Sequence, residues 1–325
     1  MEAKVLGLGN ALVDILVRIP NDNILNQFNL PKGAMNLVDE ERSAEIFEAV
    51  KGLNPQIVCG GSASNTIGGL ANMGVQTGFI GMTGVDELGD RYADDLRQSG
   101  VELLLRTSAT RTGSCISLIS PDSERTMCTC LGAAVELTSD DIDVTAFSRF
   151  THLYVEGYLV QNPGLIEGAL SAAKEKGLTT LLDLASYNVV EDNLDFLQKI
   201  ISRHVDVVFA NEEEATAFTG KEDEEALNEI GEMADTVVLK LGRRGSLVKM
   251  GHQTARVGII GGNAIDTTGA GDLYASGFIW AMTNGLDPRQ CATAGAITSG
   301  NVIEVIGSKM DATRWTSIRQ ALKNL

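Results

Sequence analysis

The chain has 325 residues, of which 44% are hydrophobic and 21% are charged, a composition typical of globular proteins with a large core. Its formal net charge of −17 argues against a nucleic-acid partner, because binding to a phosphate backbone depends on clustered Lys and Arg. No apolar stretch approaches the length of a membrane span, so no membrane partner is expected. The length fits one large α/β domain over residues 1–325.

The expected location is the cytoplasm. The N-terminus lacks a basic segment followed by an apolar run, so no signal peptide is predicted. The five cysteines form an odd number without the spacing of a disulfide framework, and the three histidines show no zinc spacing. Reduced thiols in a cytoplasmic protein explain this pattern best.

The first predicted strand, at Val5-Leu6, leads into a glycine-containing turn over residues 7–14. Leu12 replaces the third glycine of the dinucleotide-binding fingerprint, which argues against a dinucleotide-dependent oxidoreductase. Asn10 and Asp14 place an amide and a carboxylate at the end of the strand, where they suit the binding of a vicinal diol. The alternative is a turn cap and a solvated acid.

Two segments, at about 11–38 and 104–130, alternate apolar and polar residues with a period of two. The turn at Pro121-Asp122 joins two such runs, which indicates an antiparallel hairpin with one face exposed. The two insertions could pair into a small sheet that covers a site as a lid and excludes water. The alternative is an ordinary extension of the main sheet.

From about residue 150 onward, short apolar runs alternate with helical patterns. This alternation predicts a mainly parallel sheet covered by helices. Strands are expected at 152–155, 178–183, 205–209 and 236–241, and helices at 163–176, from Glu212 onward and at 223–233.

Three polar or glycine-rich turns join predicted elements. Gly60-Gly61-Ser62-Ala63-Ser64-Asn65 opens a helix with Asn65 in its first turn. Asn211 and Glu214 lie one helical turn apart, a spacing that suits magnesium held through water, or else a helix cap with an acid in the first turn. The turn from Lys240 to Gly245 could approach a nucleotide or be a simple hairpin turn.

The run Asp266-Thr267-Thr268-Gly269-Ala270-Gly271-Asp272 precedes an apolar helical stretch. Its small residues let a ligand approach the backbone, and a helix N-terminus at this point would attract an anion. Negative charge that develops during phosphoryl transfer would be stabilised there, with Asp272 placed to take a proton from a hydroxyl. The alternative is a glycine turn whose Asp caps a helix.

Helical patterns continue to the C-terminus. Asn284-Gly285 is expected to end the first helix, and Asp287 and Pro288 to begin the next. Gly307 is expected to end that second helix.

These motifs, in this order, resemble the ribokinase-like (PfkB) family of carbohydrate kinases over nearly the whole chain. The defining pair is Gly60-Gly61…Asn65 and Asp266 to Asp272, with Asn211-x-x-Glu214 and Gly242-x-x-Gly245 between them. The chain is most similar to the adenosine-kinase-like branch, on segments 9–16, 30–35, 124–127, 131–134, 154–159 and 211–215. The fold implied is α/β, a three-layer sandwich with a mainly parallel central sheet plus a small antiparallel β lid.

The resemblance implies an ATP-dependent kinase that uses Mg²⁺. Asp272 would be the base, and the backbone amides of Gly269, Ala270 and Gly271 would stabilise the transferring γ-phosphoryl group. The remaining implied roles fall into three groups. Substrate would contact Asn10, Asp14, Gly60, Gly61, Asn65 and Tyr158; ATP would contact Asn211, Lys240, Gly242, Gly245, Thr267 and Asn301; Glu214 would order magnesium waters, and Asp266 and Thr268 would border a monovalent cation such as K⁺.

Three positions depart from the family pattern. Asp183 stands where Asn is usual, which could favour a second cation. Lys240 stands where Thr is frequent, and could contact a phosphate or point to solvent. Asn188 stands where many adenosine kinases place an aromatic residue against the nucleoside base.

The leading hypothesis is therefore an ATP-dependent kinase of a nucleoside, adenosine above all. The alternative acceptor is a free sugar such as ribose, fructose or a ketodeoxy sugar acid. A remote alternative is a nucleoside- or sugar-binding protein without catalysis. A monomer and a homodimer are both compatible with the sequence.

Overall fold

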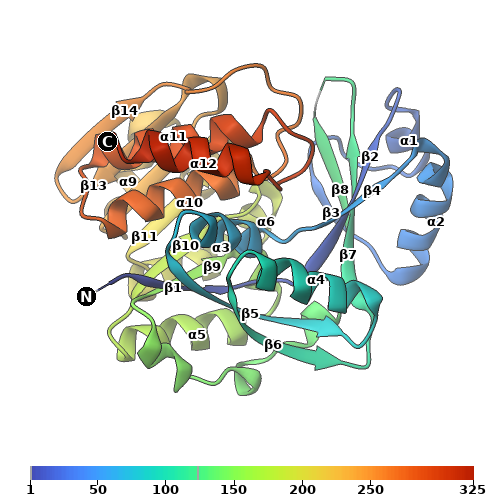
Figure 1. The fold of residues 1–325 in the computed structure, drawn as a ribbon, viewed down its shortest axis with the longest axis horizontal. Helices are drawn as coiled ribbons and strands as arrows, with labels where there is room; N and C mark the ends of the chain where they lie inside the picture. Colours follow the sequence, from blue (N-terminus) through green and yellow to red (C-terminus); the bar gives the residue numbers. More distant parts are fainter. Residues whose placement is uncertain (1, 123) are drawn as a thin grey trace.

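A nine-stranded, mainly parallel sheet forms the centre of the molecule (Figure 1). The computed structural model describes residues 2–122 and 124–325, so Met1 and Ser123, the latter within the predicted segment 104–130, lie outside it. Only the last two pairings, β12 with β13 and β13 with β14, are antiparallel. In spatial order the strands are β14 (Gln253–Val257), β13 (Ser246–Met250), β12 (Thr236–Lys240), β11 (Val207–Asn211), β10 (Thr179–Asp183), β9 (His152–Glu156), β1 (Lys4–Leu8), β5 (Gln76–Gly84) and β6 (Glu102–Ser108).

Helices cover both faces of this sheet, because its strands direct apolar side chains to both sides. One apolar cluster joins the sheet to α5 (Pro163–Glu175), α6 (Tyr187–Asp192), α7 (Leu194–His204), α8 (Glu212–Thr219) and α9 (Asp223–Ile230). A second cluster joins the opposite face to α3 (Ser62–Asn72), α4 (Glu87–Gln98), α10 (Ala270–Thr283), α11 (Pro288–Val302) and α12 (Ala312–Leu322). The predicted three-layer α/β sandwich is confirmed.

A second sheet of five strands stands beside the main one (Figure 1). Its order is β3 (Met35–Leu37), β8 (Arg125–Gly132), β7 (Thr112–Ile119), β2 (Leu12–Arg18) and β4 (Gln56–Cys59). The hairpin of β7 and β8 is antiparallel, as expected, but β2 pairs with β7 and β3 with β8 in parallel. The pairing of β2 with β4 is antiparallel too, so the small sheet is mixed. Its parallel part arises because β2 and β7 both leave the carboxyl ends of parallel strands, β1 and β6, and so run outward together.

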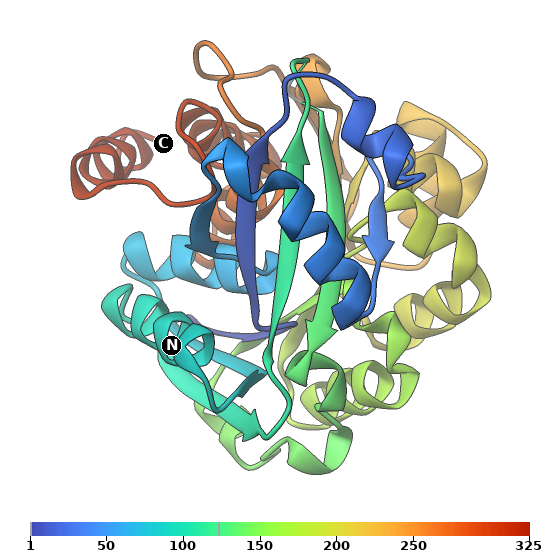
Figure 2. The ribbon, with the colours of Figure 1, turned by 90° about the vertical axis from the view of Figure 1, so that its right-hand side faces the viewer.

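The outer face of the small sheet is covered, not exposed as the alternation suggested. Two helices, α1 (Asn23–Gln27) and α2 (Glu40–Val50), pack on it, and Figure 2 shows α2 crossing in front of the strands. They bury apolar side chains of the outward face, including Val17, Ile116 and Leu118. Residues 102–108, partly assigned to the lid segment 104–130, belong instead to β6 at the edge of the main sheet.

Helix boundaries follow the predicted caps in most places. Asp287 caps α11 in a reciprocal pair with Gln290, and Pro288 is its first residue. Gly307 does not end this helix, which stops at Val302; Gly307 lies in the following loop and donates its N–H to Asp266. The predicted helix 223–233 ends earlier, at Ile230. Over residues 2–122 and 124–325, no helix has both the length and the apolar character needed to cross a membrane.

Candidate active site

A cavity of about 830 Å³ lies where the carboxyl ends of the main strands meet the inner face of the small sheet. Most of the predicted site residues line it. These are Asn10, Asp14, Gly61, Asn65, Tyr158, Asn211, Glu214, Lys240, Gly242, Gly245, Thr267, Gly269, Ala270, Gly271 and Asp272. The small sheet adds the alternating side chains Arg125, Met127, Thr129 and Leu131 of β8.

Asp272 is held by two donors from the helix that follows the first glycine turn. Ser62 Oγ donates to Asp272 Oδ1 at 2.7 Å, and Asn65 Nδ2 donates to Oδ2 at 2.9 Å. Burial raises the pKa of Asp272 above its usual value, while these two hydrogen bonds act in the opposite direction. Asn65 therefore contacts the candidate base, and its own Oδ1 accepts from Ser308. Ser62 was not singled out in the sequence, although it sits inside the quoted motif.

Asp14 faces the same cavity with its carboxylate free of hydrogen bonds to the described residues. Burial raises its pKa from 3.8 to about 6. Gly60 makes its position possible, because a Cβ there would lie 2.2 Å from Asp14 Oδ2. Gly61 has φ of +88° and its Cβ would meet the carbonyl oxygen of Asn10 at 2.5 Å, so both glycines are required by close approach. A free carboxylate of this kind suits a ligand with two adjacent hydroxyls.

Glu156 is a buried carboxylate that the sequence analysis did not assign to the site. Its oxygens accept hydrogen bonds from the backbone N and Nδ2 of Asn10 and from the backbone N of Ala63, each at 2.8 Å. Burial raises its pKa from 4.5 to about 7. The Asn10 amide is thus committed to Glu156, and Glu156 ties the ends of β1 and β9 to the start of α3. The sequence signals were an acid directly after a predicted buried strand and its place in the family-like segment 154–159.

The glycine run forms the N-terminus of α10. Gly269 has φ of +74°, and a Cβ there would lie 2.7 Å from Ser308 Cβ. The Ala270 amide donates to the Thr267 carbonyl at 3.1 Å, so it is engaged within the turn. The amides of Gly271 and Asp272 sit in the first helical turn, where N–H groups have no acceptor one turn earlier and face an anion readily.

Asp266 and Thr268 lie next to the glycine run 269–271 in the chain but do not line the cavity. The backbone N and Oγ1 of Thr268 donate to Asp266 Oδ1, and the Gly307 amide donates to Oδ2. Both residues are 1% exposed. Their contacts hold the turn before α10 in shape.

Asn211 and Glu214 form a reciprocal cap at the start of α8. Asn211 Oδ1 accepts from the Glu214 amide, while the Glu214 carboxylate accepts from both the backbone N and Nδ2 of Asn211. Burial raises the pKa of Glu214 above its usual value, while the nearby positive charge of Lys240 acts in the opposite direction. Each carboxylate oxygen keeps lone pairs that can accept a metal-bound water. Among residues 2–122 and 124–325 there is no group of three or more His, Cys, Asp or Glu side chains placed to hold a metal directly.

Asp183 and Lys240, the two charged departures from the family pattern, are partners. Lys240 Nζ lies 2.7 Å from Asp183 Oδ2, with side chains 15% and 5% exposed. This ammonium group supplies a positive charge beside Asp183, and Lys240 points into the cavity and not to solvent. The pairing could not be predicted from residues 57 positions apart.

Asn301, predicted for the ATP site, is not among the residues that line the cavity, and its contact with ATP stays a prediction. Its Nδ2 bonds to the Ile297 carbonyl within α11, and its carbonyl oxygen accepts from Arg314. The helical period explains this, because Ala296, Ser299 and Gly300 of α11 face the cavity, as does Ile303 directly after it, whereas position 301 does not. Gly60 also lies outside the lining and acts through Asp14.

Tyr158 adds an aromatic side chain to the cavity lining, and its hydroxyl donates to the Ala185 carbonyl at 3.1 Å. Asn188 bonds to the Met35 carbonyl and to Ser186, so it supports β3 of the small sheet from outside the cavity. Arg125 is a further cavity residue whose role was missed, since it appeared only within a family segment. Burial raises the pKa of Asp14, and the positive charge of Arg125 is the largest effect that lowers it.

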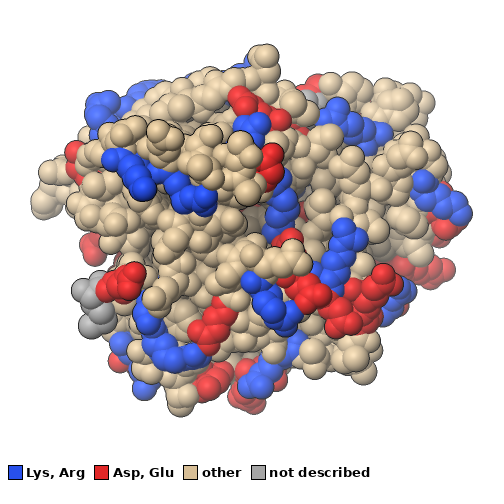
Figure 3. Space-filling model, viewed as in Figure 1, with Lys and Arg blue, Asp and Glu red and all other residues tan. Residues whose placement is uncertain are grey.

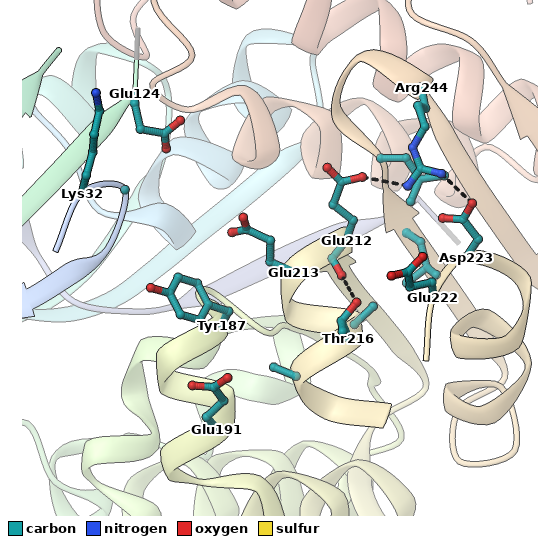
Figure 4. Close-up of a pocket in the computed structure, with 15 residues that line it drawn as sticks. Lys32, Glu124, Tyr187, Glu191, Glu212, Glu213, Thr216, Glu222, Asp223 and Arg244 are labelled. Carbon is teal, nitrogen blue, oxygen red and sulfur yellow. Dashed lines mark hydrogen bonds and ion pairs between the residues drawn. The ribbon is translucent and has the colours of Figure 1, made fainter. Parts of the chain in front are cut away.

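A second cleft of about 820 Å³ lies along α8, and most of the charged side chains that line it are acidic (Figure 4). Tyr187 lines this cleft, whereas Asp272 and the glycine run 269–271 do not. Arg244 there is paired with Glu212 at 2.9 Å and with Asp223. Acidic and basic side chains are interspersed over the face shown in Figure 3, without a basic stripe on that face.

Comparison with known proteins agrees with this arrangement. The model of the pfkB family carbohydrate kinases matches residues 35–313. The adenosine kinase of Sinorhizobium meliloti has a solved structure that is 32% identical, with a TM-score of 0.93, and covers 99% of this chain and 100% of that one. A probable sugar kinase from Rhizobium etli is also 32% identical with a TM-score of 0.93, covering 98% of both chains. The adenosine kinase of Saccharomyces cerevisiae is 26% identical over 334 residues, 94% of this chain and 96% of the yeast protein.

Proposed function

The chain belongs to the pfkB family of carbohydrate kinases, whose members are phosphotransferases acting on hydroxyl groups. From this membership and the site, we propose that the protein transfers the γ-phosphoryl group of ATP to a primary hydroxyl of a nucleoside, adenosine above all. The main support for a nucleoside acceptor is the combination of a free carboxylate and an apolar wall around Asp14. Its free carboxylate suits a ribose diol, while Leu12, Met35, Met127 and Leu131 of the small sheet add an apolar wall. A purine ring would bury against such a wall, whereas a free sugar has no apolar ring to offer.

In the proposed reaction, Asp272 accepts the proton of the attacking hydroxyl while Ser62 and Asn65 hold its carboxylate. The first turn of α10 faces the γ-phosphoryl group and stabilises the charge that builds up on its oxygens. Bound Mg²⁺ would neutralise phosphate charge, and Glu214 would hold it through water, assisted by Asn211. Gly242, Gly245 and Thr267 would border the nucleotide.

Replacing Asp272 with Ala tests the proposed base. Turnover should fall about 10²–10⁴-fold, the usual effect of removing a positioned base. Asp94→Ala, on the exposed face of α4, is the matched control and should keep the wild-type rate. A near-normal rate in Asp272→Ala would refute the role.

A substrate panel tests the acceptor. ADP release would be followed with adenosine, other nucleosides, ribose, fructose and ketodeoxy sugar acids, each with and without Mg²⁺. Adenosine should give the highest kcat/KM. Turnover of sugars without turnover of adenosine would replace the nucleoside with a free sugar, in line with the Rhizobium etli relative. Binding without any turnover would leave a non-catalytic binding protein.

A further inference from the structure

The largely buried ion pair of Lys240 and Asp183 lies in the cavity beside the start of α10. Lys240 ends β12 and Asp183 ends β10, so the pair reaches across the end of β11, which lies between them in the sheet. An ammonium group has three N–H donors, and Asp183 is its one hydrogen-bond acceptor among the described residues. Two donors therefore remain for another partner.

The ammonium group of Lys240 faces the start of α10. A Cβ placed on Gly271 would lie 3.2 Å from Lys240 Nζ, and Lys240, Asp183, Gly271 and Asp272 all line the same cavity. The first-turn amides of α10 and the ammonium group thus converge on one space from two sides. Both attract an anion, one through the helix dipole and the other through a full charge.

A purely structural role does not explain why a lysine stands at position 240. A buried ion pair gives little net stability over an apolar pair, because desolvation of both ions offsets their attraction. Asp183, Glu214 and Asp272 all act on the Lys240 ammonium, so it is the cation amid three carboxylates. An anion that enters this space needs such a cation to offset their repulsion.

We propose that Lys240 binds a non-bridging oxygen of the γ-phosphoryl group during its transfer, and that Asp183 is a positioning residue that holds the ammonium group. This inference rests on the proposed kinase function and adds a catalytic residue to it. As the acceptor oxygen bonds to the γ-phosphorus, the bond to the β,γ-bridging oxygen breaks and ADP leaves with that electron pair. The hydroxyl proton passes to Asp272, and Lys240 keeps its proton throughout.

Four variants test the proposal: Lys240→Met, Asp183→Asn, the double variant of both, and Lys249→Met on β13 as a control outside the cavity. Lys240→Met should lower kcat by about 10²-fold, the scale of losing one charged donor to the reacting group. Asp183→Asn should lower it less. Lys249→Met should match the wild type.

The double variant separates a structural role from a catalytic one. Removing both charges leaves no unpaired buried ion, so its thermal unfolding should approach the wild type while kcat stays as low as in Lys240→Met. A double variant with near wild-type kcat would overturn the proposal, because the pair would then be structural only.

Equilibrium binding provides a readout independent of turnover. With Mg²⁺ present, Lys240→Met should weaken binding of a non-hydrolysable ATP analogue at least about tenfold and change ADP binding far less, since ADP lacks the γ-phosphate. Equal affinities for the analogue in wild type and variant would also overturn it.

If the wild type phosphorylates a sugar and not adenosine, the acceptor proposal fails while these tests proceed with that sugar. If it turns over nothing, the kinase proposal fails and the binding measurement still decides whether Lys240 contacts the γ-phosphate.

Discussion

At the scale of single residues, the carboxylates of the cavity differ in what surrounds them. Asp272 is held by Ser62 and Asn65, Asp183 by Lys240, and Glu214 by Asn211, while Asp14 has no hydrogen-bond partner among residues 2–122 and 124–325. A base benefits from fixed orientation, and a ligand-binding carboxylate benefits from free lone pairs. The division of roles between Asp272 and Asp14 follows from these surroundings.

The raised pKa of Asp14 predicts that acceptor binding depends on pH. The ionised carboxylate accepts hydrogen bonds from a diol, and its pKa is raised from 3.8 to about 6, so affinity should decline as pH falls below about 6. Calorimetric titration of adenosine into the wild type without ATP between about pH 5 and 8 measures this, because Asp272, whose charge helps to raise the pKa of Asp14, is kept. Asp14→Asn should bind weakly at every pH. A constant affinity in the presence of Asp14 would contradict the assignment.

Glu156 should make folding stability depend on pH. Its pKa is raised from 4.5 to about 7, so the folded state binds the proton more tightly than the unfolded chain. The contribution of this group to the free energy of unfolding therefore falls as pH rises from about 4.5 to about 7. Urea unfolding gives the free energy of unfolding of wild type and of Glu156→Gln. The wild-type value minus the variant value should decrease over that pH range, because Gln does not titrate. A difference that grows with pH would contradict this.

At the scale of elements, α10 is apolar on nearly all sides because it is packed between α3 and α11. Small residues allow this approach. The Cβ of an alanine at Gly277 would lie 2.4 Å from the Ala294 carbonyl oxygen of α11, and one at Gly69 of α3 would lie 2.6 Å from Ser276 Oγ of α10. The helix that carries the candidate base is therefore set by close backbone contacts.

Two glycine-to-alanine substitutions should have opposite effects. Gly277→Ala should destabilise the fold by about 1–3 kcal/mol, because the methyl group meets backbone that cannot move aside cheaply. Gly68→Ala, also inside a helix but with nothing within 4 Å of the new Cβ, should stabilise it by about 0.5–1 kcal/mol. Urea unfolding of both variants gives the comparison. Equal stability of Gly277→Ala and wild type would show that α10 and α11 are less tightly packed than described.

At the scale of the whole molecule, a net charge of −17 opposes compaction through self-repulsion. Salt should therefore stabilise the fold, since the screening length drops from about 30 Å at 0.01 M to about 10 Å at 0.1 M ionic strength. The urea midpoint should rise between these two concentrations of NaCl, and by a similar amount in KCl. A gain seen only in KCl would instead point to ion binding near Asp266 and Thr268, and a fall in both salts would contradict the prediction.

Much of the fold and the site could be predicted from the sequence because the signals are local. Apolar runs alternating with helical patterns give a parallel sheet covered by helices, and the cap at Asp287 and the glycine run before Asp272 act within a few residues of themselves. The family resemblance carried by the glycine and Asn-x-x-Glu motifs implied one site for Asp272, the glycine run and Asp14, and all of them line one cavity.

Other features depend on residues that are distant in the chain, and only the tertiary structure decided them. Lys240 meets Asp183 across β11, Glu156 reaches Asn10 and Ala63, and α2 covers a face of the small sheet that alternation alone left open. Asn301 turns away from the cavity because the orientation of α11 is set by its packing on α10. Local sequence determines which element forms and which side chains it can offer, whereas long-range packing determines what those side chains meet.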